Sequence, residues 1–230
     1  MPDTAADTAA ETAANPAAAP LRIDIVSDVV CPWCVVGYRQ LLRALKDTGT
    51  PHEIHWHPFE LNPDMPDEGQ DLAEHISEKY GSTPEQSREN RQMLTDLGAG
   101  LGIAFNYGDG MRMYNTFNVH QLIHWAKTQD KADALERAFF TAYFTDRKDL
   151  SDTQVLTEIA ASVGLDADEA RAVLADQRYA QAVREAEQTW LRQGIRGVPS
   201  MVFRNKHLVT GAQGVENYTS ILNQLAQMQD

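Results

Sequence analysis

Near the start of the chain, the hydrophobic residues follow first a strand pattern and then a helix pattern. Residues 21–27 form an apolar run typical of a buried strand, and residues 31–48 place apolar side chains at helical spacing. Gly49 follows as a stop signal, and residues 52–59 alternate like a second strand. We therefore expect a β–α–β unit whose two strands are parallel.

From about residue 69 to residue 194, the pattern of apolar residues predicts helices separated by short helix-breaking segments. The expected helices cover residues 70–80, 85–101, 115–129, 131–147, 152–163, 167–176 and 178–193. Thr83, Asp152 and Asp166 stand in segments that resemble helix starts. Residues 134–144 are too apolar for a surface helix, so this segment is predicted to lie in the core.

Strand patterns return near the C-terminus. Residues 201–203 and 208–210 flank Arg204-Asn205-Lys206-His207, which is typical of a hairpin turn. A last amphipathic helix is expected from about residue 214 to residue 228.

This order of elements predicts an α/β domain with a helical insertion. Residues 21–65 and 195–230 are expected to form the α/β domain, and residues 66–194 the inserted all-helical domain. Residues 1–20, rich in Ala, Thr, Asp, Glu and Pro, are expected to be a disordered tail.

Composition and charge argue against several classes of partner. The net charge of −13 argues against nucleic acid as a partner, because phosphate binding needs clustered Lys and Arg. No apolar run approaches the ~18–20 residues of a membrane span, so no membrane partner is expected. The first 20 residues contain no Lys or Arg and so do not resemble a secretory signal. We therefore expect a cytoplasmic protein.

The candidate chemistry lies in Cys31-Pro32-Trp33-Cys34, which contains the only two cysteines of the chain. The motif falls where a strand ends and a helix begins, and the free N–H groups of a helix start stabilise a thiolate. Cys31 is expected to be the exposed nucleophile, and Cys34, one turn further, the buried resolving thiol. Pro32 suits the first helical turn, where its missing N–H costs nothing.

Other interpretations of these residues remain open. Two cysteines could supply half of a zinc site, or could simply fill space, although the spacing favours a redox dithiol. His55 and His57 share one side of a predicted strand, where a polar solvent-facing edge is favoured over a metal site. Asp24 and Asp28 are candidates for proton transfer to Cys34, with a surface or capping role as the alternative.

Several short motifs, spread over roughly residues 21–215, resemble one known family. They are Asp28-Val29-Val30-Cys31-Pro32-Trp33-Cys34, Trp56-His57-Pro58-Phe59-Glu60-Leu61-Asn62-Pro63, Lys79-Tyr80-Gly81, Asn115-Thr116, Ala142-Tyr143-Phe144, Gly197-Val198-Pro199 and Thr210-Gly211-Ala212-Gln213. This ordered set is similar to DsbA-like proteins of the thioredoxin fold, and among them to the FrnE-like cytoplasmic group. The resemblance implies a thioredoxin-like domain with a large inserted all-helical domain.

The resemblance also implies roles for individual residues. Cys31 resembles the attacking thiol, Cys34 the resolving thiol, and Pro199 the family's cis-proline, which faces the dithiol. The preceding backbone, here Val198, would be presented to a bound substrate. The implied substrate-binding residues are Pro32, Trp33 and Val198, and no metal ligand is implied.

Two departures from the family limit what the resemblance implies. Periplasmic DsbA proteins carry His where Trp33 stands, so a strongly oxidising potential is not implied. Isomerases and kappa-class glutathione transferases of this fold keep Ser in place of a dithiol, so retaining both Cys31 and Cys34 argues against them. The second, C-terminal cysteine pair of some FrnE-like proteins is absent.

We therefore predict a thiol–disulfide oxidoreductase acting on protein disulfides. The alternatives are a small-molecule isomerase or glutathione transferase-like enzyme of the same fold, and a binding module that senses redox state or metal. No cofactor is expected beyond the redox-active disulfide, with glutathione as a candidate electron donor. The expected partners are protein or small-molecule thiols and disulfides, and the chain is expected to be a monomer or a homodimer.

Overall fold

The computed structural model describes residues 19–228. The predicted tail over residues 1–20 lies almost entirely outside this range.

A four-stranded sheet, in the order β2-β1-β5-β6, forms the centre of the α/β part. Its strands are β1 (Leu21–Ser27), β2 (His52–Pro58), β5 (Ser200–Phe203) and β6 (His207–Thr210). β1 runs parallel to β2 and antiparallel to β5, so strands from both ends of the chain meet at the middle of the sheet. The parallel β–α–β unit and the C-terminal hairpin expected from the sequence are both present.

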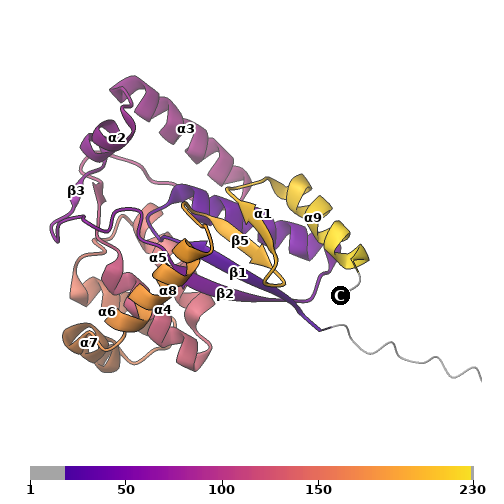
Figure 1. Cartoon of the computed structure of the whole chain (residues 1–230). Helices are drawn as coiled ribbons and strands as arrows, with labels where there is room; N and C mark the ends of the chain where they lie inside the picture. The colour runs from indigo at the N-terminus through magenta and orange to yellow at the C-terminus, as the bar shows by residue number, and fades with distance from the viewer. Residues whose placement is uncertain (1–18, 229–230) are drawn as a thin grey trace, which may run out of the picture.

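The two faces of the sheet are covered by different helices (Figure 1). α1 (Pro32–Thr48) packs with α9 (Val215–Gln227) on one face. On this face Trp56 of β2 contacts Tyr38 of α1 and Phe140 of α5, with ring centroids 4.9 and 6.2 Å apart. The next residue, His57, points to the other face and contacts Trp190 of α8, because successive side chains of a strand alternate.

The middle of the chain is mostly helical, as predicted. Its helices are α2 (Leu72–Tyr80), α3 (Pro84–Gly100), α4 (Phe117–Ala126), α5 (Ala132–Phe144), α6 (Thr153–Ser162), α7 (Ala167–Asp176) and α8 (Ala180–Arg192). Thr83, Asp152 and Asp166 each cap the helix that they precede. α5 buries most of its apolar side chains, which confirms the core position expected for residues 134–144. The fold is therefore α/β with a large helical insertion.

The structure differs from the expected elements in a few places. The helix expected over 115–129 ends at Ala126 and continues as a 3-10 turn, Lys127–Gln129. A ladder of two short strands, β3 (Gln70–Asp71) and β4 (Arg112–Met113), was not predicted, because two residues carry no detectable periodicity. Within the described residues, no helix combines the length and apolar character needed to cross a membrane.

Candidate active site

The two cysteines stand at the start of α1. Cys31 is the N-cap residue with extended backbone, Pro32 begins the helix, and the Cys34 N–H donates to the Cys31 carbonyl oxygen over 3.0 Å. Both thiols are free, and Cys34 is 1% exposed, as expected for a resolving thiol. Cys31 is only 5% exposed, so the expectation that its thiol would be exposed was wrong. Its sulfur lines a pocket beside Val198 instead of facing open solvent.

The loop before β5 lies against the dithiol. The Val198–Pro199 peptide bond is cis, as the family resemblance implies. The Sγ of Cys31 lies 3.9 Å from the carbonyl oxygen of Val198. A Cβ atom added to Gly37 of α1 would lie 3.2 Å from Cγ of Pro199, so glycine permits this close approach. The structure thus brings together the predicted residues Cys31, Val198 and Pro199.

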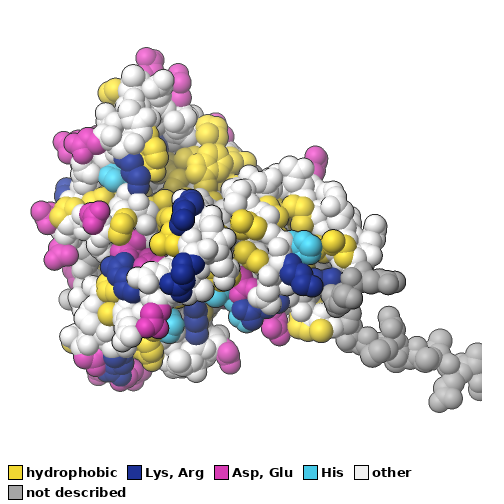
Figure 2. Space-filling model, in the orientation of Figure 1, with side chains coloured by type: hydrophobic (Ala, Val, Ile, Leu, Met, Phe, Trp, Pro, Cys, Tyr) yellow, Lys and Arg dark blue, Asp and Glu magenta, His cyan; other side chains and the backbone are white. Residues whose placement is uncertain are grey.

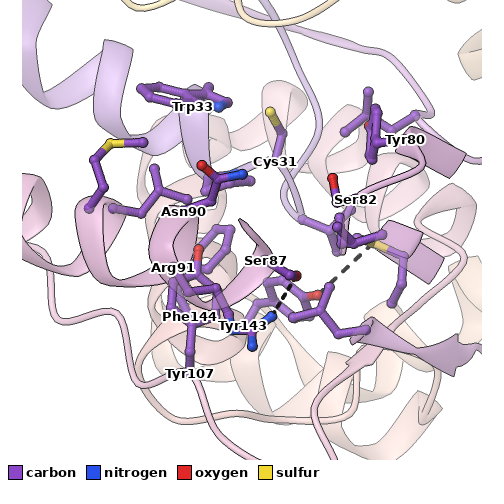
Figure 3. Close-up of a pocket in the computed structure, with 18 of the residues that line it drawn as sticks. Cys31, Trp33, Tyr80, Ser82, Ser87, Asn90, Arg91, Tyr107, Tyr143 and Phe144 are labelled. Atoms are coloured by element: carbon purple, nitrogen blue, oxygen red, sulfur yellow. Dashed lines mark hydrogen bonds between the residues drawn. The ribbon is translucent and has the colours of Figure 1, made fainter. Parts of the chain in front are cut away.

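Next to Cys31 is a pocket of about 490 Å³ between the start of α1 and helices α2 and α3. Trp33, 40% exposed, and Pro32 line it on the side of the dithiol. Figure 3 shows Trp33 and Tyr80 on either side of Cys31, and polar side chains of α3 across the pocket. This volume lies within the range of small-molecule sites.

A chain of polar groups connects Cys34 to the inserted helices. Burial raises the pKa of the Cys34 thiol well above its ordinary value, as does Cys31, whereas hydrogen bonds with the Asp28 backbone and the Ser27 hydroxyl lower it. The Ser27 hydroxyl in turn donates to Oε1 of Glu136 on α5 over 2.9 Å. Burial raises the pKa of Glu136 to about 7, against the opposing effects of His120 and Ser27. A carboxyl group whose pKa lies near neutrality is therefore one hydroxyl group away from the Cys34 thiol.

Asp28 forms the second part of this buried cluster. Its Oδ2 accepts the Leu61 N–H over 2.7 Å, and its Oδ1 lies 3.6 Å from Nε2 of His120 on α4. Both side chains are almost fully buried, so Asp28 is neither a surface residue nor the N-cap of α1. Burial lowers the pKa of His120, but Asp28, Glu136 and Glu187 outweigh this effect, so the pKa is raised overall.

Asp24 does not belong to this cluster. It is buried, and its carboxylate accepts hydrogen bonds from Arg22 over 2.6 and 2.9 Å and pairs with His57 at 2.7 Å. Burial alone would raise the pKa of Asp24, but these two partners lower it to about 2. Asp24 is thus held ionised as a structural anion, which makes it a poor proton donor.

The polar edge expected at His55 and His57 is only partly present. His57 packs against Trp190 and pairs with Asp24, so most of its side chain is shielded from solvent. His57 is shielded because α8 packs on this face of the sheet. The sequence pattern of β2 alone does not reveal this packing. No group of three or more His, Cys, Asp and Glu side chains within residues 19–228 is arranged to hold a metal ion.

Sequence reasoning missed the roles of Ser27, His120 and Glu136. A signal existed for Glu136, since it is an acidic residue inside a segment predicted to be core, where charge is costly unless it has a partner. Its partner Ser27 lies 109 positions away in the chain. No local pattern identifies such a pair.

Comparisons with known proteins agree with this geometry. A family model described as DSBA-like thioredoxin domain matches residues 22–223. The crystal structure of a probable DsbA oxidoreductase from Streptomyces coelicolor is 34% identical, with a TM-score of 0.85, covering 91% of this chain and 92% of that chain.

More distant structures share the fold alone. A 2-hydroxychromene-2-carboxylate isomerase is 13% identical, with a TM-score of 0.68, covering 90% of this chain and 96% of that chain. The cytosolic disulfide reductase DsbM from Pseudomonas aeruginosa, solved with GSH, is 17% identical with a TM-score of 0.64, covering 90% of this chain and 100% of that chain. At these identities the likeness does not separate a reductase from an isomerase.

Proposed function

Because the chain belongs to the DSBA-like thioredoxin domain family, we propose that it is a thiol–disulfide oxidoreductase that uses Cys31 and Cys34. The observation that carries the proposal is the unequal placement of the two thiols. Cys31 lines a pocket at a helix N-terminus, whereas Cys34 is buried one turn behind it. This is the arrangement that a nucleophilic thiol and a resolving thiol require.

The reaction balances as a two-electron exchange. The Cys31 thiolate attacks one sulfur of a substrate disulfide, the substrate S–S bond breaks, and the other sulfur leaves as a thiolate that takes a proton from solvent. Cys34 gives up its proton through Ser27 to Glu136 and attacks the Cys31 sulfur, which releases the second substrate thiol. The enzyme is left with a Cys31–Cys34 disulfide, which a thiol donor such as glutathione reduces again.

A trapping experiment tests this function. In the Cys34→Ser variant the mixed disulfide on Cys31 cannot be resolved, so covalent complexes with substrate proteins should accumulate in cells and disappear on reduction. Cys31→Ser is the matched control and should trap nothing. Wild-type protein should also catalyse dithiol-dependent reduction of insulin; failure of both assays would refute the proposal.

The pocket beside Cys31 favours a second candidate, a small-molecule isomerase or transferase of the same fold. Such an enzyme needs no resolving thiol, so the Cys34→Ser variant would keep its isomerase or transferase activity. If the protein is an oxidoreductase, the same variant would lose its dithiol-dependent activity. Assays of the variant with a hydroxychromene carboxylate and with a glutathione acceptor separate the two candidates.

We also propose a cytoplasmic location and membership of the FrnE-like subgroup. Two observations support this: the only cysteines of the chain form the dithiol, and Trp33 stands where periplasmic DsbA proteins carry His. Protein disulfides and low-molecular-weight thiols are the proposed partners.

A further inference from the structure

The pocket beside Cys31 has walls that are mainly apolar. Side chains from α2, α3 and α5 face the dithiol across it, including Leu72, Ile76, Leu94 and Phe144. Trp33, Tyr80 and Met93 line the same pocket although each is at least 40% exposed. In Figure 2, hydrophobic side chains gather in the hollow where α2 and α3 meet the rest of the molecule. Exposed apolar side chains around a concave site mark a binding surface.

The charge of the pocket is unusual for this chain. Acidic residues outnumber basic ones by 33 to 20 in the whole sequence, but none lines the pocket. Arg91 of α3 is the one lysine or arginine among the residues that the structure places along it. The pocket therefore favours an anion, although the chain as a whole carries a net charge of −13.

Arg91 is held in place and has unused donors. One guanidinium nitrogen, Nη1, donates to Oγ of Ser87 over 2.9 Å, and Ser87 is buried one turn earlier in α3. Within residues 19–228, Arg91 forms no ion pair with a carboxylate. A guanidinium group has five N–H donors arranged to bind a carboxylate with two of them, so Arg91 can still receive one.

We propose, on the basis of the function above, that this pocket takes a low-molecular-weight disulfide with an aromatic or apolar body and a carboxylate group. The body packs against the apolar walls, the carboxylate binds Arg91, and one sulfur of the disulfide lies at Cys31. Cys31 attacks that sulfur, the substrate S–S bond breaks, and Cys34 then releases the bound half as a thiol. The two electrons come from the reduced dithiol.

The shape of the pocket suits a small molecule. The start of α1 forms one wall and α2 with α3 the opposite wall, so the nucleophile lines an enclosure of about 490 Å³ and not a flat surface. Ser87, which holds Arg91, is itself only 5% exposed. Cys31 and Arg91 both line this one pocket, so a ligand that fills it has access to the thiol and to the guanidinium group.

Reduction kinetics with two aromatic disulfides test the proposal. Dithiobis(nitrobenzoic acid) carries carboxylates, and dithiodipyridine is a neutral aromatic disulfide. The variants are Arg91→Met, which removes the charge, Arg91→Lys, which keeps it, and Arg88→Met. Arg88 is a matched control because it is an exposed residue of α3 that does not line the pocket.

Arg91→Met should lower kcat/KM for dithiobis(nitrobenzoic acid) by about tenfold or more, mainly through a higher KM, because a hydrogen bond to a charged group is lost. Its kcat/KM for dithiodipyridine should stay near that of the wild type. Arg91→Lys should retain most of the preference for the carboxylate, and Arg88→Met should match the wild type with both disulfides.

Four outcomes would overturn the proposal, and three of them concern the aromatic disulfides. The first is that Arg91→Met lowers kcat/KM equally for both disulfides. The second is that Arg88→Met lowers kcat/KM for dithiobis(nitrobenzoic acid) as much as Arg91→Met does. The third is that the rate with dithiobis(nitrobenzoic acid) does not saturate with its concentration. A loss of insulin reduction in Arg91→Met as large as the loss with the anionic disulfide would also overturn it, since Arg91 would then serve acidic protein segments. If the proposal fails but wild-type protein still reduces insulin, the oxidoreductase function stands.

Discussion

Cys31 and Cys34 stand one helical turn apart, and their neighbours give them different chemistry. Cys31 faces the pocket and the Val198 carbonyl group, whereas Cys34 is enclosed and bonded toward Ser27. Trp33 stands between them in sequence and is 40% exposed at the mouth of the pocket. Its indole ring carries no charge, so it can shape the site but cannot stabilise a thiolate as a cation would.

Replacing Trp33 tests how the central dipeptide sets the redox potential. Trp33→His should make the dithiol more oxidising, because a protonated imidazole beside Cys31 stabilises the thiolate of the reduced form. A gain of about 1.4 kcal/mol corresponds to about 30 mV in this two-electron couple. Equilibration with glutathione buffers gives the potential.

Trp33→Phe is the control for this change, since it keeps an uncharged aromatic ring and should stay near the wild-type potential. An unchanged or more reducing potential in Trp33→His, with the same circular dichroism, would contradict the prediction. Trp33 would then contribute shape for substrate binding.

At the scale of elements, α3 is the helix that carries the far wall of the pocket. It begins with a capping box: Oγ1 of Thr83 accepts the Gln86 N–H over 3.2 Å, and Oε1 of Gln86 accepts the Thr83 N–H over 2.9 Å. Ser87 and Arg91 follow within the first two turns. The cap therefore fixes the part of the helix that holds the guanidinium group.

Loss of this cap should affect binding as well as stability. Thr83→Ala should destabilise the protein by about 1 kcal/mol, since one N–H group of the helix start loses its acceptor. It should also raise KM for dithiobis(nitrobenzoic acid), because the start of α3 frays beside Arg91. Urea unfolding and steady-state kinetics measure the two effects.

Asp152→Ala removes the same kind of cap from α6, which does not line the pocket. It should cost similar stability and leave KM unchanged. Equal changes of KM in the two variants would show that the effect is global and not local to α3.

At the scale of the whole molecule, the inserted helices complete the environment of the dithiol. β1, the loop after it and α1 supply Ser27, Asp28 and Cys34, and α4 and α5 supply His120 and Glu136. The insertion thus does more than cover the sheet. It places ionisable groups near Cys34, where burial raises the pKa of Glu136 from 4.5 to about 7.

This buried carboxyl group should make global stability depend on pH. Between pH 4.5 and about 7 the folded protein keeps a proton on Glu136 that the unfolded chain has released, so the contribution of Glu136 to stability is full below pH 4.5 and falls as pH rises toward 7. The shift corresponds to on the order of 3 kcal/mol. The Gln side chain of the Glu136→Gln variant cannot titrate, so this part of the pH dependence of stability should be absent from the variant.

Urea unfolding from pH 4 to 8 measures the effect. The difference in unfolding free energy between Glu136→Gln and the wild type should grow through this interval and level off above pH 7. Burial and the nearby Glu187 also raise the pKa of Glu60 to about 7. Because Glu60 is present in both proteins, its contribution cancels in the comparison. Parallel pH profiles would contradict the assignment of Glu136 as a buried acid with a raised pKa.

The sequence alone determined many of the local elements and the position of the dithiol motif. The bounds of β1 and α7, the caps at Thr83, Asp152 and Asp166, and the dithiol at the start of α1 all follow from spacing and from residue types within one or two turns.

Only the tertiary structure decided which neighbours the polar strand residues contact and which acidic side chain lies near Cys34. Asp24 and His57 were ambiguous until α8 covered their face, and Glu136 reaches Ser27 across 109 positions of sequence. Such contacts depend on how whole elements pack, and periodicity within one element reports only which side is apolar, not what that side will touch.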